Sequence, residues 1–327
     1  MKPIKIGIIG CGGISRAHAR GYQNLTDLFQ VTATCDVVES NAIERGQQLG
    51  AKNIYTDYKK MLKEADIDAV DICLPHDIHA EVAISSLESG KHVIVEKPIA
   101  TTLAEADNMV STANKTGLTL MVALNERYDP VHQHIKKMID NGTLGKLLCI
   151  RIDHNQNVIM PEGHWIRSRQ RLGGGVLIGS GIHRVDLLRW FGGEVKKVAN
   201  FWVKQPDRME GEIAVVMNAL FESGCIGEVT ALWAVRKAPW YEGVWVYGTN
   251  GSVYRINGLF WDSPDGYVKV DVPEADSFTE ELRHFGHCII NGQKPLTSGE
   301  EAKRSLEVVL AAYRSAETGQ VVELPMR

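Results

Sequence analysis

The chain has 327 residues, about the length of two average domains. It is 44% hydrophobic and 23% charged, a balance typical of a globular protein and not of a disordered or fibrous one. Its 36 basic and 40 acidic residues give a net charge of −4, which argues against a dedicated nucleic-acid-binding protein. No apolar run reaches the roughly 18 residues that a membrane-spanning helix needs.

In the first 122 residues, short apolar runs alternate with helical patterns. We predict strands at 4–9, 29–35, 69–74, 92–95 and 119–122, and helices at 14–24, 41–49, 79–89 and 103–116. These runs are read as mainly apolar, as expected of strands buried on both faces. Alternation of this kind predicts parallel strands with right-handed crossovers, so we expect 1–122 to form a doubly wound α/β domain.

The pattern changes after residue 122. Helices are predicted at 130–141, 175–191 and 300–318, and strands at 195–203, 213–221, 225–234, 244–248 and 253–256. Turn sequences such as ESG at 222–224 and TNG at 249–251 separate the strands. We therefore expect 123–327 to be an α+β domain with a large, open, mostly antiparallel sheet and helices on one face.

A glycine-rich segment, GCGGIS at 10–15, follows the first strand and opens the first helix. Gly10 would allow the tight turn and Gly12 would let the backbone approach a pyrophosphate, while amides from Gly13 and Ile14 onward face the anion. The third small position is Ser15, where the dinucleotide fingerprint usually has Gly or Ala. The segment predicts a Rossmann-type dinucleotide site because the strand and helix both lie where the fingerprint requires them.

Asp36 ends the second strand, 21 residues after Ser15, close to the spacing of about 20 expected for a ribose-binding acid. A carboxylate there accepts hydrogen bonds from ribose hydroxyls and repels a 2′-phosphate. Val37 and Val38 follow it and offer no positive charge. The pattern predicts NAD in preference to NADP, the alternative being a solvated acid at a strand end.

More specific motifs lie further along the chain. Residues 71–79 read DICLPHDIH and residues 87–98 read LESGKHVIVEKP, while 125–130 read NERYDP. The later segments are GGGVL at 173–177, HRVD at 183–186, PLTSG at 295–299 and AYRSA at 312–316. Together these resemble the glucose–fructose oxidoreductase/inositol dehydrogenase (Gfo/Idh/MocA) family over nearly the whole chain.

This resemblance implies a Rossmann domain joined to an open-sheet domain, and hydride transfer between a nicotinamide and a hydroxyl carbon of a sugar or cyclitol. It implies that Lys97 is the active-site lysine and that His183 is the general base. The cofactor-binding residues that it implies, beyond the glycine segment and Asp36, are Leu74, Pro75, His79, Glu96, Lys97 and Asn125. The implied substrate-binding residues are Lys97, Arg127, His154, His164, Trp165, Ser180 and His183.

One position departs from the family pattern. The family commonly has Asp four residues before the histidine, where this chain has Gly179. Gly179 either makes room for a bulkier substrate or marks a shifted function. Ser180, His154 and His164 are candidate replacements, and a structural role is as good an explanation for each. Asp186, one turn after His183, is expected to be structural.

All seven tryptophans lie after residue 160. Trp165 offers a flat face to a sugar ring, whereas most of the five at 202, 233, 240, 245 and 261 are expected in sheet packing or a subunit interface. The family commonly oligomerises through its sheet, so we expect a homodimer or homotetramer. The expected partner is a small-molecule sugar or cyclitol, with no nucleic acid and no membrane.

The six cysteines are scattered without metal-like spacing, which predicts buried thiols in a reducing, cytoplasmic location and no metal site. No Ser-His-Asp order or P-loop lysine supports acyl or phosphoryl transfer. Two alternatives to the dehydrogenase stay open. One is a lyase or epimerase that transfers hydride transiently to tightly bound NAD, and the other is a non-enzymatic dinucleotide-sensing protein.

Overall fold

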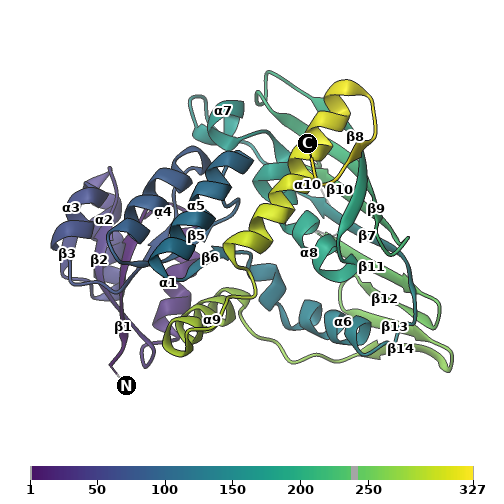
Figure 1. Ribbon diagram of the computed structural model, residues 1–327, viewed down its shortest axis with the longest axis horizontal. Coiled ribbons are helices and arrows are strands. Elements are labelled where there is room, and N and C mark those ends of the chain that lie inside the picture. Colours follow the sequence, from purple (N-terminus) through teal and green to yellow (C-terminus); the bar gives the residue numbers. More distant parts are fainter. Residues whose placement is uncertain (1, 237–241, 327) are drawn as a thin grey trace. The chain divides into compact units, whose positions relative to one another are not determined.

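The computed structural model describes residues 2–236 and 242–326, which divide into two compact units (Figure 1). The first unit combines Met1–Asp129 with Ala275–Lys303, and the second combines Pro130–Glu274 with Arg304–Arg327. The observed division thus differs from a single boundary near residue 122, because a late segment returns to the first unit.

The first unit is built on a six-stranded parallel sheet with the order β3-β2-β1-β4-β5-β6. This order confirms the predicted doubly wound fold, and the carboxyl ends of β1 and β4 meet where the strand order reverses. Its elements are β1 (Ile4–Ile9), α1 (Ser15–Gln23), β2 (Phe29–Cys35), α2 (Glu39–Leu49), β3 (Asn53–Tyr55), α3 (Tyr58–Glu64), β4 (Ala69–Ile72), the 3₁₀ turn η1 (His76–Ile78), α4 (His79–Glu88), β5 (His92–Glu96), α5 (Leu103–Thr116), β6 (Leu120–Ala123), the 3₁₀ turn η2 (Asn125–Tyr128), α9 (Ser277–Asn291) and the start of α10 (Gly299–Thr318).

Local signals explain where these elements begin and end. The α5 helix begins after Thr102, whose side chain forms a capping box with Glu105, and ends at Gly117 with φ +68°. The edge strand β3 and the α3 helix were not predicted. The strand has only three residues, each exposed or half-buried, so it carries no apolar run that would identify it.

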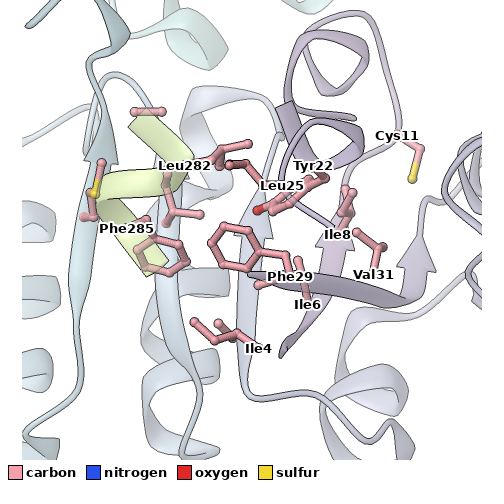
Figure 2. Packing of buried hydrophobic residues seen from close by; sticks show 14 of the residues in the cluster. Ile4, Ile6, Ile8, Cys11, Tyr22, Leu25, Phe29, Val31, Leu282 and Phe285 are labelled. Carbon is pink, nitrogen blue, oxygen red and sulfur yellow. The ribbon is translucent and has the colours of Figure 1, made fainter. Parts of the chain in front are cut away.

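The core of the first unit joins residues from both of its chain segments. Figure 2 shows Leu282 and Phe285 of α9 beside Phe29 and the side chains of β1. Leu282 and Phe285 are fully buried. A Cβ on Gly21 of α1 would come within 2.7 Å of Leu282, so the two helices approach closely. This packing explains why Ala275–Lys303 belongs to the first unit.

The second unit is built on a nine-stranded sheet with the order β14-β13-β12-β11-β7-β10-β9-β8-β15. All its neighbouring strands are antiparallel except β7 and β10, which confirms the predicted mostly antiparallel sheet. Its elements are α6 (Pro130–Asp140), β7 (Leu147–Asn155), the 3₁₀ turn η3 (Trp165–Arg167), α7 (Arg169–Leu172), the π-helical turn η4 (Leu177–Gly181), α8 (Ile182–Gly192), β8 (Val195–Lys204), β9 (Glu212–Phe221), β10 (Ile226–Leu232), β11 (Glu242–Gly248), β12 (Gly251–Arg255), β13 (Leu259–Ser263), β14 (Gly266–Val270), the rest of α10 and β15 (Val322–Glu323).

One face of this sheet carries exposed apolar side chains. Phe201 of β8 is paired with Val216 of β9, and Leu220 of β9 is paired with Ile226 of β10, so the four side chains point to the same face. Phe201 is 76% exposed and Ile226 is 53% exposed, whereas alternate residues of these strands are buried.

Among the described residues, no helix is both long and apolar enough to span a membrane.

Candidate active site

The glycine-rich turn after β1 has the backbone that a dinucleotide site requires. Gly10 has φ +91°, and a Cβ there would lie 2.3 Å from the carbonyl oxygen of Cys73, so only glycine fits. Gly12 and Gly13 are exposed and have no atom within 4 Å of an added Cβ. Since α1 begins directly after Ile14, which is exposed, this open backbone fits a pyrophosphate at a helix N-terminus.

Ser15 replaces the third glycine of the fingerprint and is fully buried. Its hydroxyl donates to the carbonyl of Gly12 at 2.8 Å, and the Arg45 guanidinium donates to the same hydroxyl at 3.2 Å. The serine therefore fits the helix–strand packing and also ties the turn to α2.

Asp36 lies half-buried at the carboxyl end of β2, beside the glycine turn. One carboxylate oxygen accepts the backbone N–H of Cys11 at 2.7 Å, and the other accepts that of Val38 at 2.8 Å. These bonds fix the plane of the carboxylate and leave further lone pairs for ribose hydroxyls. Val37 and Val38 are exposed and uncharged, so the site fits NAD in preference to NADP.

The loop after β4 holds Leu74 and Pro75 half-buried, where a nicotinamide ring could contact them. His79 differs from its predicted role in cofactor binding. It is fully buried, and its ring nitrogens lie 2.8 Å from the carbonyl oxygens of Leu74 and Pro98. The ring connects the loop after β4, at Leu74, with the loop after β5, at Pro98. Burial lowers the pKa of the imidazole. The prediction of direct cofactor contact is therefore corrected to a supporting role.

Lys97 follows β5 directly and is half-buried. Burial lowers the pKa of its ammonium group, while the neighbouring charges of Glu96 and Glu126 act in the opposite direction. A lysine in such surroundings exchanges a proton more easily than a solvated one, which suits acid–base work on a substrate oxygen.

Glu96 is buried and connected on both sides. Its Oε2 accepts the backbone N–H of Lys97 at 3.1 Å, and its Oε1 lies 3.0 Å from Nε2 of His18. Hydrogen bonding and charge from His18 hold the pKa of the Glu96 carboxyl below its usual value despite desolvation. His18 was not predicted as a site residue, because it is 78 residues away in sequence.

Asn125 and Arg127 lie on η2 in the same unit. Asn125 is half-buried and its amide donates to the hydroxyl of Ser277 at 2.8 Å, which leaves its carbonyl oxygen for a ligand. Arg127 is almost fully buried, donates to the carbonyl of Leu296 at 3.2 Å and lies 3.5 Å from the Glu301 carboxylate. Arg127 therefore anchors a loop, and the prediction of substrate binding is corrected.

In the second unit, His183 and Ser180 are the half-buried residues of a segment that is otherwise buried from Val176 to Arg189. They are three residues apart, at the end of η4 and the start of α8, so they lie on neighbouring positions of one helical face. This segment therefore presents an imidazole and a hydroxyl together.

Gly179 is explained by Trp233 and not by space for a substrate. A Cβ at Gly179 would lie 2.4 Å from Cη2 of Trp233, whose side chain is buried at 4% exposure. The indole N–H donates to the hydroxyl of Ser180 at 2.7 Å and to the side-chain oxygen of Gln156 at 3.0 Å. The expected room beside His183 is thus filled by an aromatic ring.

His154 is almost fully buried at the end of β7, with Nδ1 3.2 Å from the guanidinium of Arg184. Arg184 also pairs with Glu242 at 2.6 Å, and Glu242 pairs with Arg255 at 2.7 Å. His154 belongs to this buried ion network, so its predicted contact with substrate is corrected.

Asp186 is buried and accepts a hydrogen bond from the hydroxyl of Ser305 at 2.7 Å, which agrees with its expected structural role.

His164 and Trp165 are half-buried and stacked, with ring centroids 6.0 Å apart. Nδ1 of His164 accepts the backbone N–H of Ile166, so its other nitrogen and the Trp165 face stay candidates for substrate contact. Trp240, one of the tryptophans expected in packing, lies outside the described residues.

All six cysteines are free thiols in the structure, five of them buried and Cys149 half-buried. Burial raises the pKa of the Cys11 and Cys35 thiols to about 12, so both stay protonated. The five buried thiols agree with the expectation of buried, unpaired cysteines, whereas Cys149 is free but only half-buried.

Two family models match the chain. Residues 4–124 match the model described as "Oxidoreductase family, NAD-binding Rossmann fold", and residues 132–254 match the "GFO/IDH/MocA C-terminal domain". The two matches fall in the two sheets described above.

Named relatives match the chain over nearly its full length. It is 28% identical to myo-inositol 2-dehydrogenase of Thermotoga maritima over 98% of both chains. It is 26% identical to scyllo-inositol 2-dehydrogenase (NAD(+)) of Bacillus subtilis over 99% of this chain and 97% of the other. A levoglucosan dehydrogenase solved with NADH and levoglucosan superposes with a TM-score of 0.93 at 24% identity, covering 99% of this chain and all of the other, which shows a shared fold.

Proposed function

Because the chain belongs to the Gfo/Idh/MocA family of oxidoreductases, whose Rossmann fold binds NAD, we propose that it oxidises a secondary hydroxyl of a sugar or cyclitol. The observation that carries the proposal is the pairing of an open glycine turn and a fixed Asp36 with a half-buried lysine after β5 in the same sheet. The relatives named as inositol and levoglucosan dehydrogenases support the substrate class.

In the proposed reaction, the alcohol carbon loses its hydrogen as hydride and the alcohol oxygen loses a proton, so that a ketone forms. NAD, when bound, supplies the hydride acceptor. The proton passes to the imidazole of His183, a base whose ordinary pKa is near neutrality. The ammonium of Lys97 stabilises the negative charge that develops on the oxygen.

Because Gly179 has no carboxylate, the hydroxyl of Ser180 is the polar group beside His183 on this helical face. The hydroxyl accepts the Trp233 indole N–H, so its own proton is available for donation to a substrate oxygen. We therefore propose that Ser180 and His183, with Lys97, contact the substrate, and that His164 and Trp165 border it.

The test follows NAD reduction by absorbance at 340 nm for a panel of cyclitols, aldoses and anhydrosugars, with NAD and NADP compared. We expect substrate-dependent reduction with preference for NAD. Lys97→Met should lower kcat by about 100-fold or more while NAD affinity changes little. Lys60→Met, at an exposed lysine of α3, is the matched control and should keep full turnover.

Two results would favour the alternatives. Product formation without net NAD reduction would indicate transient hydride transfer, a possibility that the missing carboxylate at Gly179 supports. Tight NAD binding without turnover of any member of the panel would favour a dinucleotide-sensing protein. Near-normal turnover of Lys97→Met would overturn the role of the lysine.

We also propose that the chain forms a homo-oligomer through the open face of its nine-stranded sheet. Val203, which is 58% exposed, extends the apolar surface formed by Phe201, Val216, Leu220 and Ile226. Apolar surface of this kind commonly marks an interface. Light scattering after gel filtration should show a dimer or tetramer.

A double substitution, Phe201→Glu with Ile226→Glu, should lower the mass of the assembly. Val321→Glu is the control, because Val321 is 59% exposed but lies outside the sheet strands. An unchanged mass of the double variant would contradict this interface.

The six free thiols support a reducing, cytoplasmic location, which fractionation of the source cells would test.

A further inference from the structure

A buried histidine connects two carboxylates beneath Lys97. His18, on α1, is fully buried, and its Nδ1 lies 2.8 Å from Oδ2 of Asp71 on β4. Its Nε2 lies 3.0 Å from Oε1 of Glu96 on β5. Asp71 is fully buried as well, and Glu96 is nearly so.

An imidazole between two ionised carboxylates needs a proton on each ring nitrogen, because carboxylates only accept hydrogen bonds. Removing either proton would leave a carboxylate facing a nitrogen lone pair inside the core, an arrangement that is strongly unfavourable. The charge of Asp71 accordingly raises the pKa of His18 well above its usual value, in spite of its burial. The placement of one ring between two carboxylates therefore favours the imidazolium form of His18.

The network continues from Glu96 to the candidate active site. The second carboxylate oxygen of Glu96 accepts the backbone N–H of Lys97, so the carboxylate is held from both sides. The charges then alternate from Asp71 (negative) through His18 (positive) and Glu96 (negative) to Lys97 (positive). Alternation lets four buried or half-buried charges coexist with no net charge.

Burial shifts the pKa values of the other titratable groups around His18 toward their neutral forms. Burial raises the pKa of the Glu281 carboxyl on α9 well above its usual range, and it does the same for the phenol of Tyr22. The Cys73 thiol lies 3.5 Å from Asp71, and burial raises its pKa also. Burial lowers the pKa of His79 near Glu96, while its hydrogen bonds to two backbone carbonyls act in the opposite direction. His18 is thus the positive group that compensates Asp71 and Glu96 within the described core.

The same cluster does not favour a metal ion. Ligand atoms of His18, Asp71 and Cys73 lie within 4.8 Å of one another, a spacing that a metal could use. A metal would require a thiolate at Cys73 and an imidazole lone pair, whereas the thiol is protonated and both ring nitrogens face carboxylates.

We propose that His18 is a positioning residue for the reaction: its imidazolium keeps Glu96 ionised and oriented, and Glu96 in turn holds Lys97 in its working position. The proposal rests on the proposed role of Lys97 as the active-site lysine. The charged residues that support Lys97 thus come from two neighbouring strands, β4 and β5, and from helix α1.

The first test replaces His18→Gln, an amide that can donate to one carboxylate but must face the other with its oxygen. We expect kcat to fall by about 10–100-fold, the effect of losing one buried charged hydrogen bond, with little change in NAD affinity. The acidic limb of the kcat–pH profile should move to higher pH and become steeper, because Glu96 loses the partner that keeps it ionised. A purely structural defect would lower kcat equally at every pH, and that result would overturn the proposal.

His92→Gln is the matched control. His92 begins β5, the strand that Glu96 ends, and its Nδ1 accepts the backbone N–H of Thr119 at 3.1 Å. The same substitution there should leave the shape of the pH profile unchanged.

The second test needs neither a variant nor activity. In the intact protein labelled with ¹⁵N-histidine, the imidazole of His18 should give the signal of a doubly protonated ring at pH 7.5, a unit above its ordinary pKa of 6.5. A neutral ring at that pH would overturn the proposal even if His18→Gln failed to fold. A doubly protonated His18 in a protein that reduces no NAD would support the charge network but contradict the proposed function. Failure of the network and failure of the proposed function can therefore be told apart.

Discussion

The contact between Gly179 and Trp233 allows a sharp test of why this chain lacks a side chain beside His183. In Gly179→Ala, the new methyl group would lie 2.4 Å from Cη2 and 2.8 Å from Cζ2 of the indole. The ring cannot move aside freely, because its N–H bonds to Ser180 and Gln156 fix its position. The substitution therefore overpacks a buried site.

Two opposing effects set the size of the change. Overpacking a well-packed core costs about 1–3 kcal/mol. Replacing glycine by alanine in a helix would by itself stabilise by up to about 1 kcal/mol. Gly179→Ala should therefore lower the free energy of unfolding by about 1–2 kcal/mol. For a unit of this size, that is a fall of roughly 2–8 °C in Tm.

A double-mutant cycle with Trp233→Leu isolates the contact. With the ring removed, the alanine should be neutral or stabilising, so its destabilising effect disappears or changes sign in the Trp233→Leu background. Urea unfolding of the four proteins should give a coupling energy of about 1–3 kcal/mol. Additive effects, or a Gly179→Ala protein as stable as the parent, would refute the view that the indole determines glycine at this position.

Three further predictions concern the first unit. Asp36→Ala should weaken NAD binding by about 10–100-fold and NADP binding much less; titration calorimetry showing equal losses would contradict the assigned ribose contact. Because the pKa of His18 is raised in the folded protein, its contribution to the free energy of unfolding is complete below pH 6.5. This contribution is lost as the pH rises through the pKa of His18 in the folded protein. The pKa of Glu96 is lowered on folding, so its contribution is lost as the pH falls below 4.5. Urea midpoints against pH should show both slopes, with the alkaline one absent in His18→Gln. Thr102→Ala should lower the free energy of unfolding by about 1 kcal/mol, because it removes the N-terminal cap of α5. The control Thr112→Ala, inside the same helix, should change it by only a few tenths of a kcal/mol in thermal unfolding. Equal effects of the two substitutions would argue against the capping box.

Local chemistry made much of the fold readable in the sequence. The parallel strand Ile4–Ile9 is almost wholly apolar and buried, because both faces of the sheet are covered. The neighbouring strand Phe29–Cys35 instead alternates apolar and polar residues, with Gln30 exposed and Thr32 half-buried. The glycine turn and Asp36 are recognisable because a dinucleotide site depends on backbone shape and on one acid at a fixed spacing. Lys97 is indicated as a site residue by the family resemblance of the EKP motif at the end of a strand, and not by local chemistry alone.

The tertiary structure alone decided which polar residues work together. His18 reaches Asp71 and Glu96 across 53 and 78 residues because α1 lies against β4 and β5 in the folded sheet, and no spacing in the chain encodes that approach. His79, Arg127 and His154 have the chemistry of site residues. Burial and bonding to carbonyls, a carboxylate and a guanidinium give them supporting roles instead. Sequence determines which groups are available, whereas packing determines which of them meet water, ligand or one another.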